Sequence, residues 1–360
     1  MKTAAAAVAA VLFCTGAAQA ADFDGTLSAQ SAILVDAQSG RVLFEKNADE
    51  RRLLASTTKI MTGLLVCETE DLAREISVPA QAAGVEGSSL YLRAGERVTI
   101  ETLLYGLLLR SGNDAAVALA IAADGSVEAF CARMNARAQE LGMRNTHFEN
   151  PNGLDGDGQF STARDLSKLA VAAMENETFR TVVSSKSFSS GARSFTNHNK
   201  LLWRVEGCDG VKTGYTKKAG RILVGSAVRN GRRLVCVTMN DPDDWRDQSA
   251  LFAYGFSAFT LQRIVSSGEA VGSAAVVGSE TTRVRLLAGA DASYPLAEGE
   301  TIETRLHAPD FVYAPLVPGQ AGWLEVLVDG NCAGEVPVYY EEGAEAKTPK
   351  RGLWKRIIGG

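Results

Sequence analysis

Residues 53–63, LLASTTKIMTG, place Ser56 three residues before Lys59, with apolar residues on both sides of the pair. Residues three apart share one face of a helix, so the lysine amine can reach the serine hydroxyl. An amphipathic helix whose lysine extends to water gives this pattern. A serine nucleophile with a lysine base gives it too. Because Ser-x-x-Lys occurs often by chance, the rest of the chain must decide between the two interpretations.

Two further short motifs follow in the sequence. Ser111-Gly112-Asn113 lies at a break between two apolar helical stretches, and Lys212-Thr213-Gly214 lies at the start of a predicted series of hairpins. Taken alone, the first is typical of a helix N-cap and the second of a polar strand with a bulge glycine. All three motifs in this order, each in fitting local structure, favour a single catalytic site.

The chemistry of such a site accounts for the residue types. A serine hydroxyl becomes a nucleophile when a base takes its proton. Burial and a second cation both lower the pKa of a lysine, and Lys212 is the expected cation beside Lys59. The start of a helix also offers free N–H groups to an oxyanion. A Ser-His-Asp triad is disfavoured, because none of the chain's three histidines sits in a nucleophile-type motif.

The Lys-Thr-Gly motif is suited to binding a peptide end. Gly214 leaves room for a substrate to lie along the strand edge as an added strand. Lys212 and Thr213 offer a cation and a hydroxyl to a terminal carboxylate. The trio of Ser-x-x-Lys, Ser-x-Asn and Lys-Thr-Gly is shared by penicillin-binding proteins and class A β-lactamases.

Over residues 25–345 the chain resembles the low-molecular-mass penicillin-binding proteins that are serine-type D-Ala-D-Ala carboxypeptidases. Besides the three motifs, the resemblance is carried by LFEKNADERRLLASTTKIMT, LLLRSGNDAAVALA, HFENPNGLDGDGQFSTARDLSKLA, NHNKLLW and CDGVKTGYTKKAGRILVGSA. It implies removal of the terminal D-alanine from peptidoglycan stem peptides that end in D-Ala-D-Ala. It also implies that β-lactam antibiotics are covalent inhibitors.

The resemblance also implies a role for each site residue. Ser56 would be the acylated nucleophile, Lys59 its base, and Ser111 the relay that passes a proton to the leaving D-alanine. Asn113 would hold the substrate amide. The terminal carboxylate would lie against Lys212, Thr213 and Gly214, and the N–H groups of Ser56 and Tyr215 would form the oxyanion hole.

Three positions depart from the family pattern. Leu54-Ala55 stands where the family commonly has Pro-Ala, and Asn152 and Tyr215 stand where it often has histidine. The oxyanion role of Tyr215 needs only its N–H group, which any residue at this position supplies.

The patterning predicts an α+β fold with two domains. Residues 21–262 are expected to form the serine peptidase domain, an antiparallel sheet flanked by helices. Its signals include a hairpin turn at Asn230-Gly231 and a late helix over 243–259. Residues 263–341 read as a small all-β domain of short strands between Gly, Pro and Asp turns.

The two ends of the chain indicate where it works. Residues 1–20 have the charge, apolar core and Ala-Gln-Ala end of a signal peptide, so export to the extracytoplasmic face of the membrane or the periplasm is expected. Residues 342–360 read as a linker and tail. Within them, 347–360 form a short basic amphipathic segment that is suited to an anionic membrane surface. A disordered basic tail is the alternative.

Composition limits the partners. The formal charge of −5 gives no electrostatic signature for nucleic acid. The mature chain has an odd number of scattered cysteines and no Cys-x-x-Cys or His/Cys cluster, so neither a disulfide framework nor a metal or other cofactor is predicted.

Three other functions stay open. A β-lactamase would share the acylation machinery, but no glutamate between Ser111 and Lys212 has an asparagine four residues on, as the class A deacylation motif requires. An endopeptidase that cuts cross-links would break a similar bond. A non-catalytic peptidoglycan-binding protein would not need three intact motifs.

Overall fold

The computed structural model describes residues 12–13, 23–317 and 319–341. The chain divides into two compact units. One, called here the α+β unit, holds described residues 23–38 and 42–258. The other, called the β unit, holds described residues 12–13, 39–41, 259–317 and 319–341. Among the described residues no single helix combines the length and hydropathy needed to cross a membrane, although the bent pair α3 (Asn113–Asp124) and α4 (Val127–Glu140) meets the criterion by length and composition.

The α+β unit is built on one antiparallel five-stranded sheet. The strand order is β3 (Val42–Lys46), β2 (Ser31–Asp36), β10 (Arg232–Met239), β9 (Gly220–Arg229) and β8 (Cys208–Thr216). The predicted hairpin between β9 and β10 is confirmed, since Asn230 and Gly231 both have positive φ, 51° and 77°. Strand β8, which carries Lys-Thr-Gly, forms one edge of this sheet.

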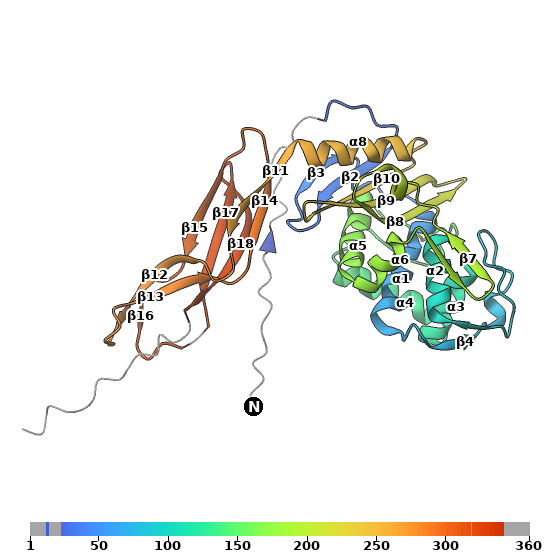
Figure 1. The fold of residues 1–360 in the computed structure, drawn as a ribbon, viewed down its shortest axis with the longest axis horizontal. Helices are drawn as coiled ribbons and strands as arrows, with labels where there is room; N and C mark the ends of the chain where they lie inside the picture. The colour runs from blue at the N-terminus through green and yellow to red at the C-terminus, as the bar shows by residue number, and fades with distance from the viewer. Residues whose placement is uncertain (1–11, 14–22, 318, 342–360) are drawn as a thin grey trace, which may run out of the picture. The chain divides into compact units, whose positions relative to one another are not determined.

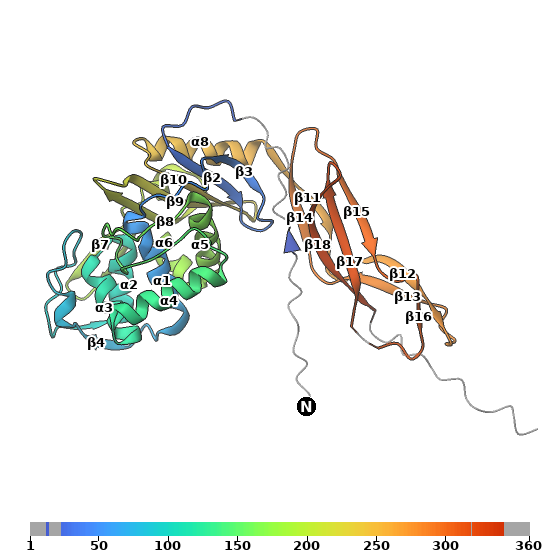
Figure 2. The same cartoon turned by 180° about the vertical axis from the view of Figure 1, so that it is seen from behind.

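Helices cover both faces of the sheet (Figures 1 and 2). Helix α8 packs on one face and α5 on the other, with the remaining longer helices clustered beyond α5. In chain order the helical segments are η1 (Ala55–Thr58), α1 (Lys59–Thr69), η2 (Ala80–Ala82), α2 (Ile100–Leu109), α3 (Asn113–Asp124), α4 (Val127–Glu140), α5 (Ala163–Glu175), α6 (Glu177–Ser184), α7 (Leu201–Arg204) and α8 (Asp244–Ser257). Two small hairpins, β4–β5 (Glu75–Ser77, Arg97–Thr99) and β6–β7 (Ser187–Ser190, Arg193–Thr196), complete the unit.

Local signals account for where these helices begin and end. The side chains of Thr99, Ser126, Thr162 and Asn176 each accept a backbone N–H bond at the start of a helix. The break predicted at Ser111-Gly112 separates α2 from α3. The late helix predicted over 243–259 is α8, which ends at Ser257, and strand β11 follows from Phe259.

The β unit contains strands and no helix among its described residues. Its main sheet has the order β15 (Ile302–His307), β17 (Gln320–Val328), β18 (Asn331–Tyr340), β13 (Arg283–Ala288), β12 (Ala270–Val277) and β16 (Phe311–Tyr313). Strand β1 (Leu12–Phe13) pairs with β18, and β11 (Phe259–Val265) pairs with β14 (Ala292–Ala297). The prediction of an α+β domain followed by an all-β domain is confirmed.

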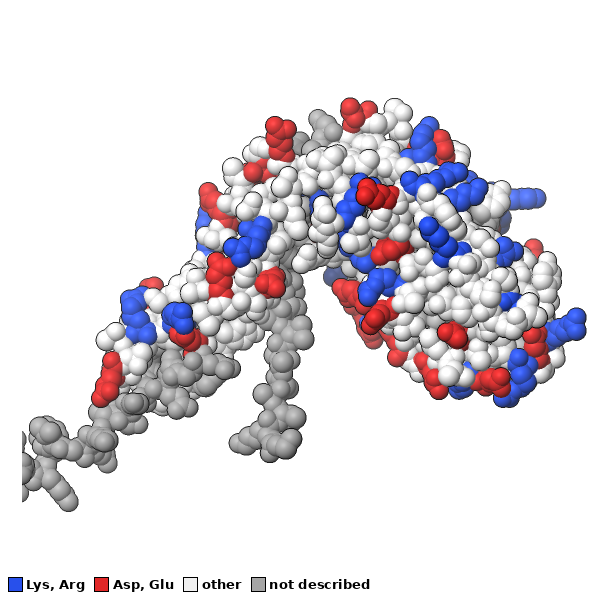
Figure 3. Space-filling model, viewed as in Figure 1, with Lys and Arg blue, Asp and Glu red and all other residues white. Residues whose placement is uncertain are grey.

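Charged side chains of both signs are mixed over the surface of the α+β unit. On the face shown in Figure 3, Lys and Arg alternate with Asp and Glu, with no extended area of one sign. Many of these charges are paired, as in the contacts of Arg164 with Glu45 and Asp49 and of Arg137 with Glu68. The charge on this face therefore marks no single site.

Candidate active site

Ser56 lies in the short 3-10 segment η1, directly before α1. The helix begins at Lys59, so Ser56 sits one turn ahead of it. Strand β8 approaches this segment closely. A Cβ atom built on Gly214 would lie 3.3 Å from the Ser56 nitrogen, the Leu54 oxygen and the Ala55 Cβ. Glycine at 214 therefore lets the edge of the sheet come within reach of the serine.

Lys59 is fully buried and makes three hydrogen bonds from its amine. Nζ lies 3.0 Å from Ser56 Oγ, 2.6 Å from Asn113 Oδ1 and 2.5 Å from the Asn152 carbonyl oxygen. The amide and carbonyl oxygens can only accept hydrogen bonds. A neutral amine would give them its two N–H groups, which leaves its lone pair for the hydrogen of the Ser56 hydroxyl.

The surroundings of Lys59 favour that neutral form. Burial lowers its pKa well below the usual value, the charge of Lys212 lowers it further, and Asp114 partly opposes both effects. Burial also lowers the pKa of Lys212, to about 7. The expected cation beside Lys59 is thus in place, and both lysines are buried in the α+β unit.

Ser111 and Asn113 flank the same space from the loop between α2 and α3. Ser111 has a positive φ of 64°, and its buried Oγ has no hydrogen-bond partner among the described residues. Asn113 Nδ2 donates to the Glu86 carbonyl at 2.6 Å, which fixes its Oδ1 toward Lys59. The Cβ of any residue other than glycine at 87 would lie 2.7 Å from that Nδ2.

The Lys-Thr-Gly motif occupies the free edge of the sheet. Lys212 is 1% exposed, and its Nζ donates to the Thr213 carbonyl at 2.8 Å. Strand β8 pairs with β9 on one side, and on the other it pairs with no strand among the described residues. A cavity of about 480 Å³ opens here, with Ser56, Ser111, Thr213, Gly214 and Tyr215 in its lining. The sequence-predicted residues are therefore brought together, around the cavity or directly behind it.

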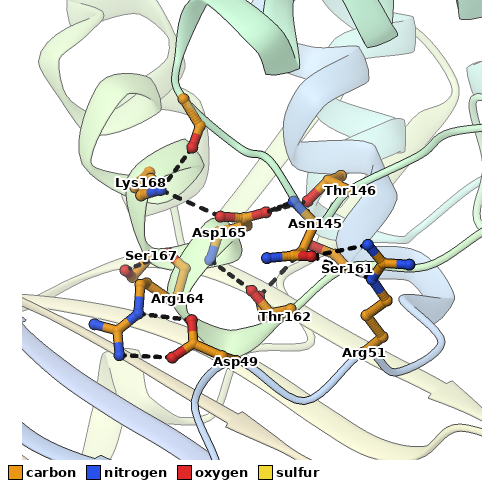
Figure 4. Close-up of polar contacts among 11 residues, drawn as sticks. Asp49, Arg51, Asn145, Thr146, Ser161, Thr162, Arg164, Asp165, Ser167 and Lys168 are labelled. Atoms are coloured by element: carbon orange, nitrogen blue, oxygen red, sulfur yellow. Dashed lines mark hydrogen bonds and ion pairs between the residues drawn. The ribbon is translucent and has the colours of Figure 1, made fainter.

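A polar network holds Asn145 and Thr146, which come shortly before the loop that carries Asn152 (Figure 4). Buried Asp165 accepts hydrogen bonds from the Asn145 nitrogen and the Thr146 hydroxyl, and Lys168 pairs with it. Arg51 donates to the Asn145 side chain from the segment that leads to Ser56. The network thus connects the serine's segment with the residues that come shortly before the loop that carries Asn152.

Gly153 makes this arrangement possible. It has a φ of 86°, and a Cβ there would lie 1.9 Å from the Ala55 carbonyl oxygen. The loop can therefore approach the segment before Ser56 only because residue 153 is glycine.

Several residues of the site were not expected from the sequence. Arg221 binds both oxygens of Asp244, at 2.6 and 2.9 Å, lies over the Trp245 ring, and lines the cavity with both. Asp114, buried beside Asn113, accepts N–H bonds from Leu90 and Leu92. The carboxylate next to the Ser-x-Asn motif was a signal for Asp114, whereas the backbone carbonyl of Asn152 has no sequence signal.

Comparisons with known proteins identify the family. A sequence profile described as D-alanyl-D-alanine carboxypeptidase matches residues 15–243, more than half of the chain. The chain belongs to the D-alanyl-D-alanine carboxypeptidase family. A second profile, for the C-terminal domain of penicillin-binding protein 5, matches residues 259–346.

Individual relatives cover both units. D-alanyl-D-alanine carboxypeptidase DacF of Bacillus subtilis is 32% identical, over 87% of this chain and 85% of its own length. DacA of Escherichia coli is 33% identical, over 87% and 82%. The crystal structure of penicillin binding protein 5 from Haemophilus influenzae superimposes with a TM-score of 0.79 at 28% identity and covers 89% of this chain and 98% of its own. The chain is a serine-type D-Ala-D-Ala carboxypeptidase of the penicillin-binding protein type.

Metal ligands and reactive cysteines are the other functional groups to consider in this carboxypeptidase. Among the described residues, no group of three or more His, Cys, Asp or Glu side chains is arranged to hold a metal ion. Among the described residues, Cys67, Cys131, Cys208 and Cys236 form no disulfide. Burial raises the pKa of the Cys67 and Cys208 thiols to about 12, so neither is a reactive thiolate near neutral pH.

Proposed function

We propose that this carboxypeptidase works through an acyl-enzyme on Ser56, with Lys59 as the base. The observation that carries the proposal is the buried amine of Lys59 at 3.0 Å from Ser56 Oγ, with its two other hydrogen bonds taken by groups that can only accept. Neutral Lys59 takes the hydroxyl proton as Ser56 Oγ attacks the carbonyl carbon of the penultimate D-alanine.

Collapse of the tetrahedral intermediate then breaks the peptide bond and leaves the acyl group on Ser56. The leaving D-alanine nitrogen needs a proton, and Ser111 Oγ is the group we assign to relay it from Lys59. The backbone N–H groups of Ser56 and Tyr215 stabilise the oxyanion. Water then attacks the ester, which releases the shortened peptide and restores the serine.

The substrate is a peptidoglycan stem peptide that ends in D-Ala-D-Ala. It lies along the free edge of β8, where its main chain can pair with the strand as an added strand. Asn113 binds the amide, while Lys212 and Thr213 bind the terminal carboxylate beside Gly214. A β-lactam ring enters the same site and acylates Ser56.

Acylation by penicillin tests the nucleophile directly. Intact-protein mass spectrometry of the mature chain after incubation with a penicillin should show one added drug molecule. Ser56→Ala should abolish the adduct, and Ser88→Ala, a second serine in the cavity lining, should keep it. A Ser56→Ala protein that still gains the mass would end the proposal.

Product analysis tests the reaction. Peptides ending in D-Ala-D-Ala should release free D-alanine, and chelators should leave the rate unchanged. Cleavage only within cross-linked peptides would identify an endopeptidase instead, and rapid turnover of penicillin would identify a β-lactamase.

We also propose that the protein is exported and held at the membrane surface through residues 347–360. The support is the signal-peptide pattern of residues 1–20 and the basic amphipathic pattern of the tail, both of which lie outside the described residues except for 12–13. N-terminal sequencing of the secreted chain should begin at Ala21. Removal of 347–360 should weaken binding to anionic vesicles, and equal binding by the truncated chain would rule the tail out.

A further inference from the structure

Large apolar side chains are exposed together at one edge of the β unit. Val277, Phe311, Tyr313 and Val317 are 46%, 53%, 69% and 77% exposed, respectively. They are called here the β12–β16 patch. Val277 pairs with Tyr313 in the parallel register of β12 and β16, and the rings of Phe311 and Tyr313 are in edge contact at 5.8 Å. Val277, Phe311 and Tyr313 therefore form one surface, and Val317 is an exposed apolar residue four positions after Tyr313.

The two strands have apolar side chains on both faces. Their inner residues, Val276 and Val312, belong to a small core with Ala274 and Val284. A strand with one solvated face normally alternates apolar and polar residues. The neighbouring β13 does so, since exposed Arg283 and Arg285 alternate with buried Val284 and Leu286. The outward apolar residues of β12 and β16 are thus not needed for the core.

The described chain ends at the small core that lies under β12 and β16. Tyr340 packs against the same small core, and the Glu341 nitrogen donates to the Arg285 carbonyl at 3.0 Å. β12, β13 and β16 lie together at one end of the β unit in both views (Figures 1 and 2). The residues that follow contain Trp354 and, from 347 onward, five Lys and Arg residues and no acidic residue. Residue 347 follows Glu341, the last described residue, by six positions in the sequence.

We propose that the β12–β16 patch inserts into the interface of a phospholipid bilayer. Aromatic side chains with one polar atom, such as Tyr313, are favoured at the boundary between headgroups and acyl chains. Exposed patches of this kind mark protein or membrane contacts, and the basic composition of residues 347–360 fits a lipid surface. The patch supplies apolar contact and the tail supplies cations. Two such signals give more stable attachment than one.

The two contributions differ in their response to salt. Attraction between the tail's cations and anionic lipid is screened as ionic strength rises. The patch contains no charged side chain, so its contribution persists at high salt. Binding at high salt therefore isolates the patch.

Vesicle co-sedimentation of the mature chain tests the proposal. The probe is a vesicle of equal parts phosphatidylglycerol and phosphatidylcholine, at low and high salt. The patch variant carries Phe311→Ser, Tyr313→Ser and Val317→Ser. The matched control carries Tyr91→Ser, Trp203→Ser and Leu261→Ser, three exposed apolar residues elsewhere that are 84%, 51% and 38% exposed. Penicillin acylation and thermal unfolding show that each protein is folded.

The patch variant should bind about tenfold or more weaker than the control at both salt concentrations, since each buried apolar side chain contributes favourably to partitioning. Tyr313→Trp, which keeps an aromatic ring, should bind more tightly than the wild type. Unchanged binding of both the patch variant and Tyr313→Trp would overturn the proposal. Tighter binding by the patch variant would also overturn it, because the patch would then be the docking place of the chain's own tail.

Discussion

The α+β unit buries two lysines almost completely, whereas described residues 259–317 and 319–341 bury no charged side chain at all. Lys59 and Lys212 are 0% and 1% exposed. The β unit differs in another way, because Val277, Phe311 and Tyr313 form one exposed apolar surface on β12 and β16. The first unit buries two amines at the candidate active site, and the second exposes neighbouring apolar side chains.

The buried lysines oppose folding, and the exposed apolar surface lowers solubility. A buried amine loses its hydration, and an exposed aromatic patch invites association. Neither is required by the architecture, since each unit has an apolar core of its own. The difference therefore shows where selection for function acted: on chemistry in the first unit and, by our proposal, on surface attachment in the second. The predictions below test each side of this comparison.

The largest expected effect comes from removing the buried base. Lys59→Met should slow acylation of Ser56 by penicillin by about 10⁴-fold, since general-base catalysis contributes up to this much. Lys46→Met, which changes a lysine away from the site, should acylate at the wild-type rate. The measurement is the time course of adduct formation by mass spectrometry. A Lys59→Met enzyme within tenfold of wild type would remove Lys59 from the role of base.

The next effect concerns the glycine that lets the Asn152 loop approach the serine. Gly153→Ala should lower D-alanine release by at least about 100-fold, because its Cβ would meet the Ala55 oxygen at 1.9 Å and displace the loop. Gly142→Ala has a similar φ of 68° but no atom within 4 Å of the new Cβ, so it should lose some stability and keep its activity. Equal activities of the two variants would show that the close approach is not required.

The sequence predicted the fold well wherever local chemistry decided it. The Asn230-Gly231 turn, the break at Ser111-Gly112 and the strand that carries Lys-Thr-Gly were all expected, because turn residues and periodicity act over a few residues. The apolar outer face of β12 and β16 was not expected, since the sequence alone does not show which face of a strand meets the core.

The site was predicted in its side chains and missed in its backbone. Residue type and spacing predicted Ser56, Lys59, Ser111 and Lys212. They could not predict the carbonyl of Asn152, because every residue has a backbone carbonyl and only the folded loop brings this one to Lys59. Arg221 and Asp244 were missed for a related reason, since they meet through pairing of β9 with β8 and packing of α8.

Removing a buried lysine that is not the base should stabilise the protein. Lys212→Met should raise the free energy of unfolding at pH 7 by about 1–4 kcal/mol, because an apolar side chain of similar size replaces a desolvated amine. Carboxypeptidase activity should fall, since the carboxylate loses its cation. Denaturant unfolding and D-alanine release measure the two effects, and a variant with unchanged or lower stability would contradict the first.

The increase in the free energy of unfolding from Lys212→Met should become smaller as the pH rises. The pKa of Lys212 is about 7 in the folded protein, against 10.5 for an unperturbed lysine. Between these values the unfolded chain binds a proton that the folded chain does not, so wild-type stability rises with pH across this window. The advantage of the variant should therefore be largest below about pH 7 and disappear toward pH 10.5.

A substitution that leaves a cavity in the core of the β unit should lower stability without changing the acylation rate of Ser56. Val326 is fully buried in the apolar core of that unit, and Val326→Ala should cost about 2 kcal/mol through lost contacts and the space left behind. The acylation rate of Ser56 should stay at the wild-type value. Thermal unfolding and the penicillin time course check both statements, and a slower acylation would show that the β unit's core influences the site.

The smallest effect is expected at Tyr215, an exposed aromatic residue in the α+β unit. Its side chain is 65% exposed at the cavity, and the role we assign to this position uses only its backbone N–H group. Tyr215→Ala keeps that group, so kcat/KM for D-alanine release should change by less than about threefold, well under 1 kcal/mol of transition-state stabilisation. Tyr215→His introduces the residue often found at this position in the family, and its kcat/KM should also change by less than about threefold. A loss of more than tenfold in the alanine variant, with activity retained by histidine, would show that the side chain contacts the substrate. Exposed aromatic surface would then serve function in both units.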